Sequence, residues 1–171
     1  MITRLATVIS FFITLNKVIA VESIDHSAYI KALGSNEVKR GSQLYSVHCS
    51  SCHGKEGQGV NMPEPQNHTM LAPSLAGSPR VNEKNYRYLA EIILKGMTGP
   101  IDGFTYGGVM APMEAYDNEW ISSVMTYVRR SWGNSGAPVN PKDIEKVRGW
   151  NKKRSTAFTL AELNIPTPKA K

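Results

Sequence analysis

The sequence contains only two cysteines, Cys49 and Cys52. No further thiol remains to build a disulfide framework, or a site in which four thiolates hold zinc or an iron–sulfur cluster. Long apolar runs are also scarce. The main one, Leu5 to Leu15, is shorter than the ~20 residues that a membrane-spanning helix needs. The 14 acidic residues show no pairing typical of a hydrolase, and no Ser/His/Asp pattern accompanies them.

The first twenty residues have the pattern of a secretory signal peptide. Arg4 precedes the apolar run, and Val18-Ile19-Ala20 provides small residues for cleavage. We therefore expect residues 1–20 to direct export to the periplasm and to be removed, which leaves no stable membrane span. An uncleaved membrane anchor is the alternative.

Positive charge is concentrated near the C-terminus. The formal net charge is +6, and residues 139–171 hold eight Lys or Arg against three acids, whereas residues 21–138 hold ten against eleven. The main body is thus nearly neutral, and the basic character belongs to a C-terminal extension over residues 135–171. Nucleic-acid binding requires clustered basic residues on a folded face, so we expect no nucleic-acid partner.

Both cysteines belong to the segment Cys49-Ser50-Ser51-Cys52-His53, which reads C-x-x-C-H. This is the attachment motif of a c-type haem, in which each thiol forms a thioether with a haem vinyl group. His53 then becomes the proximal ligand of the iron. A redox dithiol or half of a zinc site could share the C-x-x-C spacing, but the remaining histidines supply no second ligand pair.

The residues around this motif resemble the opening of a class I (mono-haem) cytochrome c domain of the bacterial periplasmic type. The similar pattern is Gly41-x-x-x-Tyr45-x-x-x-Cys49-x-x-Cys52-His53-Gly54. The resemblance implies an all-α cytochrome c fold, with N- and C-terminal helices that cross around one covalently bound haem c and its iron. It also implies that Gly41 permits a close helix crossing and that Tyr45 packs against it.

This interpretation divides the chain into a lead-in over residues 21–35, a cytochrome c domain over 36–134 and the extension over 135–171. Apolar periodicity and capping residues predict four helices: one over about 36–49, one capped by Asn82 that ends at Lys95-Gly96, one over about 117–132 capped by Asp117, and a short one that begins at Asn140-Pro141. The extension is either a docking strap for a partner or a segment folded back on the domain.

The resemblance also implies roles for two further segments. Pro73-Ser74-Leu75-Ala76-Gly77 is similar to the P-x-L-x-G segment of the family, which implies that the Pro73 carbonyl accepts a hydrogen bond from His53. Gly108-Val109-Met110 is similar to the start of the family's Gly-Val-Met-Pro segment, which implies Met110 as the second iron ligand.

The second ligand stays open between two methionines because proline follows one residue later than in the family pattern. Met113 is the alternative to Met110, and His68, a histidine in a loop, is a weaker candidate. A neutral thioether favours ferrous iron and keeps the iron six-coordinate in both oxidation states, as an electron carrier requires.

The sequence therefore predicts an exported electron carrier and not an independent enzyme. Its partners would be protein redox partners, with a quinoprotein dehydrogenase and a terminal oxidase as candidates. Two alternatives remain open: a haem subunit that acts only within a dehydrogenase or oxidase complex, and a haem sensor or peroxidase with an open iron site.

Overall fold

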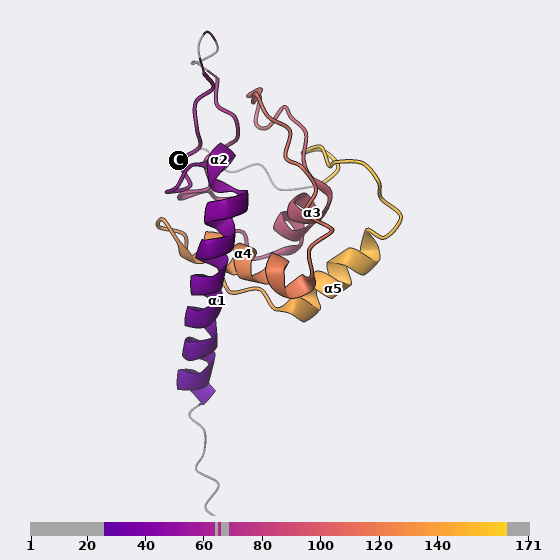
Figure 1. Ribbon diagram of the computed structural model, residues 1–171. Helices are drawn as coiled ribbons and strands as arrows, with labels where there is room; N and C mark the ends of the chain where they lie inside the picture. The colour runs from indigo at the N-terminus through magenta and orange to yellow at the C-terminus, as the bar shows by residue number, and fades with distance from the viewer. Residues whose placement is uncertain (1–25, 64, 66–68, 164–171) are drawn as a thin grey trace, which may run out of the picture.

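The computed structural model describes residues 26–63, 65 and 69–163 (Figure 1). The named elements within these residues are all helices: α1 His26–His48, α2 Ser50–His53, α3 Arg87–Lys95, α4 Asn118–Arg130 and α5 Pro141–Trp150. The predicted all-α fold is confirmed. The predicted signal peptide, residues 1–20, and His68 lie outside the described residues.

The fold is organised by the crossing of α1 and α4, seen in purple and orange in Figure 1. At Gly41 the two helices are so close that a Cβ atom would lie 2.1 Å from the Ser123 carbonyl oxygen. Tyr45, one turn further on, is buried, and its ring centroid lies 5.4 Å from that of Tyr127 and 4.9 Å from that of Trp132. The predicted crossing at Gly41 and Tyr45 is confirmed.

Helix α1 is longer than the sequence pattern predicts. It begins at His26, ten residues before Asn36, so the described part of the predicted lead-in is helical and continuous with the domain. Residues 26–35 contain no proline, and extending an existing helix by one residue costs far less than nucleating a new one. The single glycine there, Gly34, is therefore insufficient to stop the helix.

Two of the predicted helix caps are confirmed. The Asp117 side chain accepts a hydrogen bond of 2.7 Å from the Trp120 backbone N–H at the start of α4. The Asn140 side chain accepts one of 2.9 Å from Lys142 at the start of α5, where Pro141 occupies the first position. Both caps satisfy amide groups that have no partner within the helix.

The prediction that Asn82 caps α3 is wrong. The helix begins at Arg87, and Asn82 instead joins two distant segments of the chain. Its amide nitrogen donates to the Asn134 side-chain oxygen at 2.8 Å, and its own oxygen accepts from the Ser135 backbone N–H at 2.7 Å. An asparagine suited to capping is thus used for a tertiary contact with the segment that follows α4.

The C-terminal extension folds back on the domain and completes its core. Val139, Ile144 and Val147 are buried in the same apolar cluster as Ile121 and Met125 of α4. A second cluster combines Met97, which follows α3, with Phe158 and Leu163 of the extension. None of the helices in the described part of the chain is long and apolar enough to cross a lipid bilayer.

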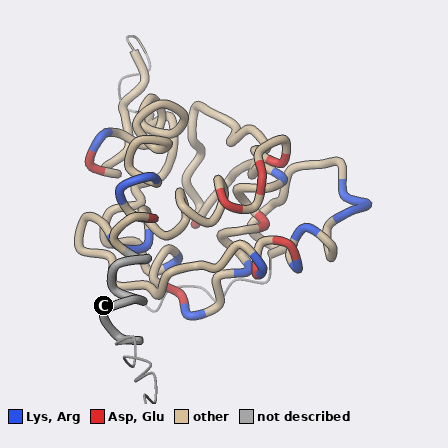
Figure 2. Tube along the Cα trace, turned by 60° about the horizontal axis from the view of Figure 1, so that its bottom comes forward, with Lys and Arg blue, Asp and Glu red and all other residues tan. Residues whose placement is uncertain are grey.

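Acidic and basic positions are interspersed along the trace (Figure 2). Part of the basic character of the extension serves the fold itself, because Arg148 and Arg154 are half-buried and hydrogen-bonded to other residues of the chain. The lysines at 142, 146, 152 and 153 are exposed.

Candidate haem-binding site

The C-x-x-C-H segment forms a single helical turn at the end of α1. The His53 backbone N–H donates to the Cys49 carbonyl at 3.0 Å, so α2 winds the motif through one turn. Residues three and four apart share a face of a helix, and Cys49, Cys52 and His53 accordingly line the same cavity. Two sulfurs and one imidazole thus converge on one space.

His53 is oriented by the segment that contains Pro73. Its Nδ1 atom lies 3.1 Å from the Pro73 carbonyl oxygen. A carbonyl can only accept, so Nδ1 carries the proton and the Nε2 lone pair is free for a metal. This is the arrangement that the family resemblance implies for the proximal ligand.

The glycine-rich turn after His53 holds the Pro73 segment in place. The backbone N–H groups of Leu75 and Ala76 donate to the Gly57 carbonyl at 2.7 and 3.0 Å. A Cβ at Gly57, where φ is +67°, would lie 2.5 Å from the Trp132 ring. Glycine is therefore required here both by the backbone conformation and by the close approach of the aromatic ring.

Burial shifts the pKa values of the motif in directions that suit haem binding. Desolvation lowers the pKa of His53, although its hydrogen bond to Pro73 opposes the shift, and the imidazole is kept neutral as a metal ligand must be. Burial, and to a smaller extent Cys52, raises the pKa of the free Cys49 thiol to about 11. Reactive C-x-x-C dithiols need a lowered thiol pKa, so this environment disfavours the redox-dithiol interpretation.

The cavity has a volume of about 590 Å³, within the range of cofactor sites. Its walls are mainly apolar side chains of α3, α4 and the loops, among them Leu89, Ile92, Ile93, Val124 and Val128. A flat, apolar macrocycle suits such walls, since it gains from leaving water.

One polar feature of the cavity was not predicted from the sequence. Among the described residues, one buried side-chain polar atom has no hydrogen-bond partner, and it is Nη1 of Arg80. Arg80 lines the cavity and is paired through its other nitrogens with Asp102, which lies beside it there. Haem carries two carboxylate groups, so an unpartnered guanidinium N–H in this wall fits the group that the motif implies. Because arginine is common on surfaces, sequence offered no signal for it.

Three methionines line the cavity on the side formed by the loop before α4. Met110 and Met113, the two methionines predicted as candidates for the second iron ligand, both do so, and Met97 is the third. Met97 and Met110 are paired through their backbones, with N–H···O distances of 3.1 and 3.0 Å. Met62 and Met70 instead pack beside Gly107 and Gly59, in contacts between loops.

An aromatic cluster borders the site next to Cys49. The rings of Tyr116 and Trp120 are stacked with centroids 4.2 Å apart, and the His48 ring meets both edge-on at 5.2 Å. His48 and Trp120 also line the cavity. These side chains cover the wall where α1 and α4 meet.

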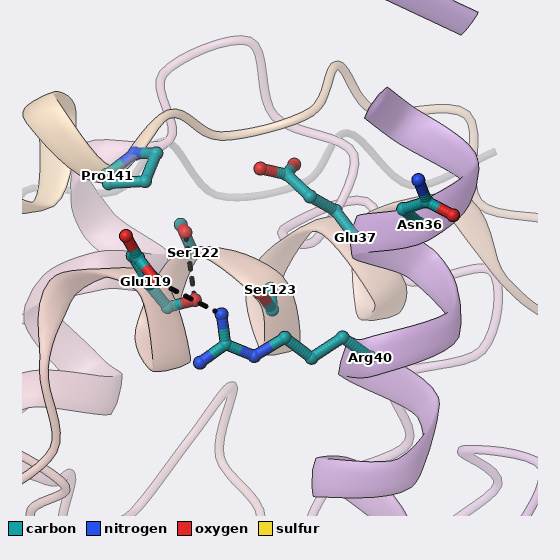
Figure 3. A pocket seen from close by; sticks show the side chains of 7 residues that line it. All are labelled: Asn36, Glu37, Arg40, Glu119, Ser122, Ser123 and Pro141. Carbon is teal, nitrogen blue, oxygen red and sulfur yellow. Dashed lines mark hydrogen bonds and ion pairs between the residues drawn. The ribbon is translucent and has the colours of Figure 1, made fainter. Parts of the chain in front are cut away.

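A second, smaller cavity of about 260 Å³ lies between α1, α4 and the start of α5 (Figure 3). Its polar residues include Arg40 and Glu119, which form an exposed ion pair of 3.3 Å across the two helices. Cysteine, histidine and methionine are missing from its lining. In the described part of the chain no group of three or more His, Cys, Asp or Glu side chains could hold a metal ion.

Comparison with known proteins agrees with this site. The family model for cytochrome c matches residues 38–132. The chain is 29% identical over 129 residues to a cytochrome c-552 of Thermus thermophilus, an alignment that covers 71% of this chain and 92% of that protein. It is also 27% identical over 130 residues to the fructose dehydrogenase cytochrome subunit of Gluconobacter japonicus, with 74% of this chain but only 24% of that subunit covered.

Proposed function

The chain belongs to the cytochrome c family, with one covalently bound haem c and a role in electron transport, and from this we propose that it carries single electrons between protein redox partners outside the cytoplasm. The haem iron supplies the one-electron couple between the ferric and ferrous states. Cys49 and Cys52 would tether the haem, and His53 and Met110 would ligate its iron.

The observation that carries this proposal is the hydrogen bond between His53 Nδ1 and the Pro73 carbonyl. It fixes the tautomer and the ring orientation, and it makes the imidazole a stronger donor to the iron. Arg80 would hold a haem carboxylate through its free Nη1, and the apolar walls would keep water away from the iron. A site that stays closed in both oxidation states rearranges little, which favours electron transfer over chemistry on a substrate.

We propose Met110 as the distal ligand because it follows Gly108-Val109, as the family resemblance implies, and is the more extensively packed of the two candidates. Backbone hydrogen bonds hold both candidates: two pair Met110 with Met97, while the Met113 N–H donates to the Ile93 carbonyl at 2.9 Å and the Met113 carbonyl accepts from the Tyr116 N–H at 3.1 Å. Met110 also packs against both apolar clusters, while Met113 packs against one. A ligand that must remain bound in both oxidation states gains from such packing.

Substitution of each methionine by alanine tests the assignment. The ferric protein should show a weak near-infrared sulfur-to-iron band, which should be lost in Met110→Ala and kept in Met113→Ala. The opposite result would transfer the role to Met113. Loss of the band in Met97→Ala alone would overturn both assignments. Fast and complete binding of carbon monoxide to the ferrous wild type would instead support the sensor or peroxidase alternative, with its open iron site.

A second candidate function is that of a haem subunit in a dehydrogenase complex. The identity with a cytochrome subunit of a fructose dehydrogenase favours it, although the chain spans about a quarter of that subunit's length. Purification from the native source at modest salt separates the two functions, because a stable dehydrogenase or oxidase partner would co-purify with a subunit. The N-terminal sequence of the same mature material tests the predicted export and cleavage after about residue 20.

A further inference from the structure

The segment that carries both methionine candidates is held by the C-terminal extension at its α4 end. Arg148 of α5 donates from Nη1 to the Glu114 carbonyl and from Nη2 to the Tyr116 carbonyl, each at 2.7 Å, and from Nε to the Asn118 side chain at 3.1 Å. A planar guanidinium thus fixes three acceptors between Met113 and the first turn of α4. Lys95 of α3 adds an ion pair with the Glu114 carboxylate.

The other end of the segment is held through Met97. This residue forms an antiparallel bridge with Met110 and a parallel bridge with Phe158 of the extension. On the Phe158 side, the Thr98 N–H donates to the Phe158 carbonyl at 2.9 Å and the Phe158 N–H donates to the Gly96 carbonyl at 3.0 Å. Three backbone segments therefore lie side by side, with Met97 in the middle.

Phe158 is itself fixed by its neighbours in the extension. The Arg154 guanidinium lies over its ring, 3.7 Å from the centroid, and donates to the Ala157 carbonyl at 2.8 Å. The Phe158 side chain is 5% exposed and packs with Met97 and Leu163. Removing its ring would open the cluster directly behind the Met97–Met110 pair.

From these two anchors we propose that the C-terminal extension is a brace that keeps the distal-ligand segment on the iron, with Arg148 as its main positioning residue. The proposal rests on the proposed function, in which a methionine of residues 110–113 ligates the iron. Both anchors lie outside the stretch that the family model matches, which ends at residue 132. Without Arg148, two carbonyls of the segment would face water, and the segment would lift away from the cavity more often.

Binding of imidazole to the ferric holoprotein measures how often the segment lifts, because imidazole can bind only where the methionine has left. Its apparent affinity is proportional to the fraction of molecules in that open state. Loss of charge-assisted hydrogen bonds should raise this fraction by about tenfold or more, so Arg148→Ala should bind imidazole about tenfold more tightly than the wild type. Phe158→Ala should shift the affinity in the same direction.

Arg40→Ala is the matched control, since it also removes an arginine, but one whose partner is the Glu119 carboxylate of α4 and not the segment (Figure 3). Its imidazole affinity should stay within about twofold of the wild type. Arg148→Lys should fall between wild type and Arg148→Ala, because an ammonium on one stem cannot reproduce the three-donor fork. If Arg148→Ala does not fold with haem, the imidazole affinities of Arg148→Lys and Phe158→Leu are compared with that of the wild type instead.

The two possible failures are distinguishable. Absence of the near-infrared sulfur-to-iron band from the wild type would refute methionine ligation, and with it the proposed function. A wild type that shows the band, together with Arg148 and Phe158 variants whose imidazole affinity equals that of Arg40→Ala, would overturn the brace and leave the proposed function intact. Melting temperatures of all variants, measured alongside, separate local opening from global unfolding.

Discussion

Replacing Gly41 by alanine should destabilise the protein, although alanine is the better helix former by about 1 kcal/mol. The new Cβ would lie 2.1 Å from the Ser123 carbonyl oxygen and 2.6 Å from Tyr127 Cβ. Both are atoms of α4 that no side-chain rotation can move, so α1 and α4 would have to separate. Overpacking of this kind costs about 1–3 kcal/mol and occasionally more. Because both clashing atoms are fixed, we take the upper part of this range and subtract the helix-propensity gain, which leaves a net loss of about 1–2 kcal/mol, or roughly 2–8 °C in melting temperature.

Thermal unfolding of the holoprotein, followed by far-ultraviolet circular dichroism, measures this loss. Gly149→Ala is the matched control, because Gly149 also lies in a helix but has no atom within 4 Å of the position of its Cβ. That variant should melt at or slightly above the wild-type temperature. If Gly41→Ala melted as high as Gly149→Ala, the close approach of α1 and α4 at Gly41 would be refuted.

Three further predictions follow from single contacts. Asp117→Ala removes the cap on Trp120 and should cost about 1 kcal/mol in unfolding free energy, or about 2–4 °C by the same thermal assay. Arg80→Gln removes a cation from the cavity wall and should lower the reduction potential by roughly 20–60 mV in redox titration, whereas no change would exclude its contact with a haem carboxylate. Hydrogen bonds from Thr159 and Arg154 lower the pKa of Glu162 from 4.5 to about 2, so the stabilisation is present above pH 4.5 and is lost as pH falls toward 2. The melting temperature of Glu162→Gln should accordingly lie below that of the wild type at neutral pH and converge with it near pH 2.

Sequence predicted those parts of the fold that depend on local chemistry. A capping aspartate and an asparagine followed by proline mark the starts of α4 and α5, because each satisfies backbone groups within its own turn. The resemblance to class I cytochrome c domains predicted the crossing at Gly41 and Tyr45, and the close approach of α1 and α4 there agrees with it. Asn82 shows the limit of such reasoning: its local surroundings resemble a cap, but two of its side-chain hydrogen bonds join it to residues more than fifty positions away, Asn134 and Ser135.

The candidate site likewise contains residues that the sequence predicted and residues that it did not. The residues of the C-x-x-C-H motif are recognisable from their spacing and Pro73 from the resemblance to the family, and the structure brings them to one cavity. Their roles as haem ligands stay predictions. The sequence did not single out Arg80, because its role depends on which buried atom lacks a hydrogen-bond partner. It also did not decide among the three methionines, because that choice depends on loop geometry. Neither leaves a periodic pattern in the sequence.

The match to the family model ends at residue 132, but the packed unit continues beyond it. Arg129, near the end of α4, is buried and donates to the carbonyls of Val81 and Glu83 and also to that of Ala137, in the extension. A chain cut at 134 would lose that last acceptor and would uncover the core surface now covered by Ile144 and Val147, both fully buried. Burying each such side chain contributes about 1.5–3 kcal/mol, a large share of the 5–15 kcal/mol that stabilises a typical domain. The extension is therefore part of the packed unit that supports the cavity, and residues 36–134 alone would lack both the core contacts of Ile144 and Val147 and the anchors of the methionine segment.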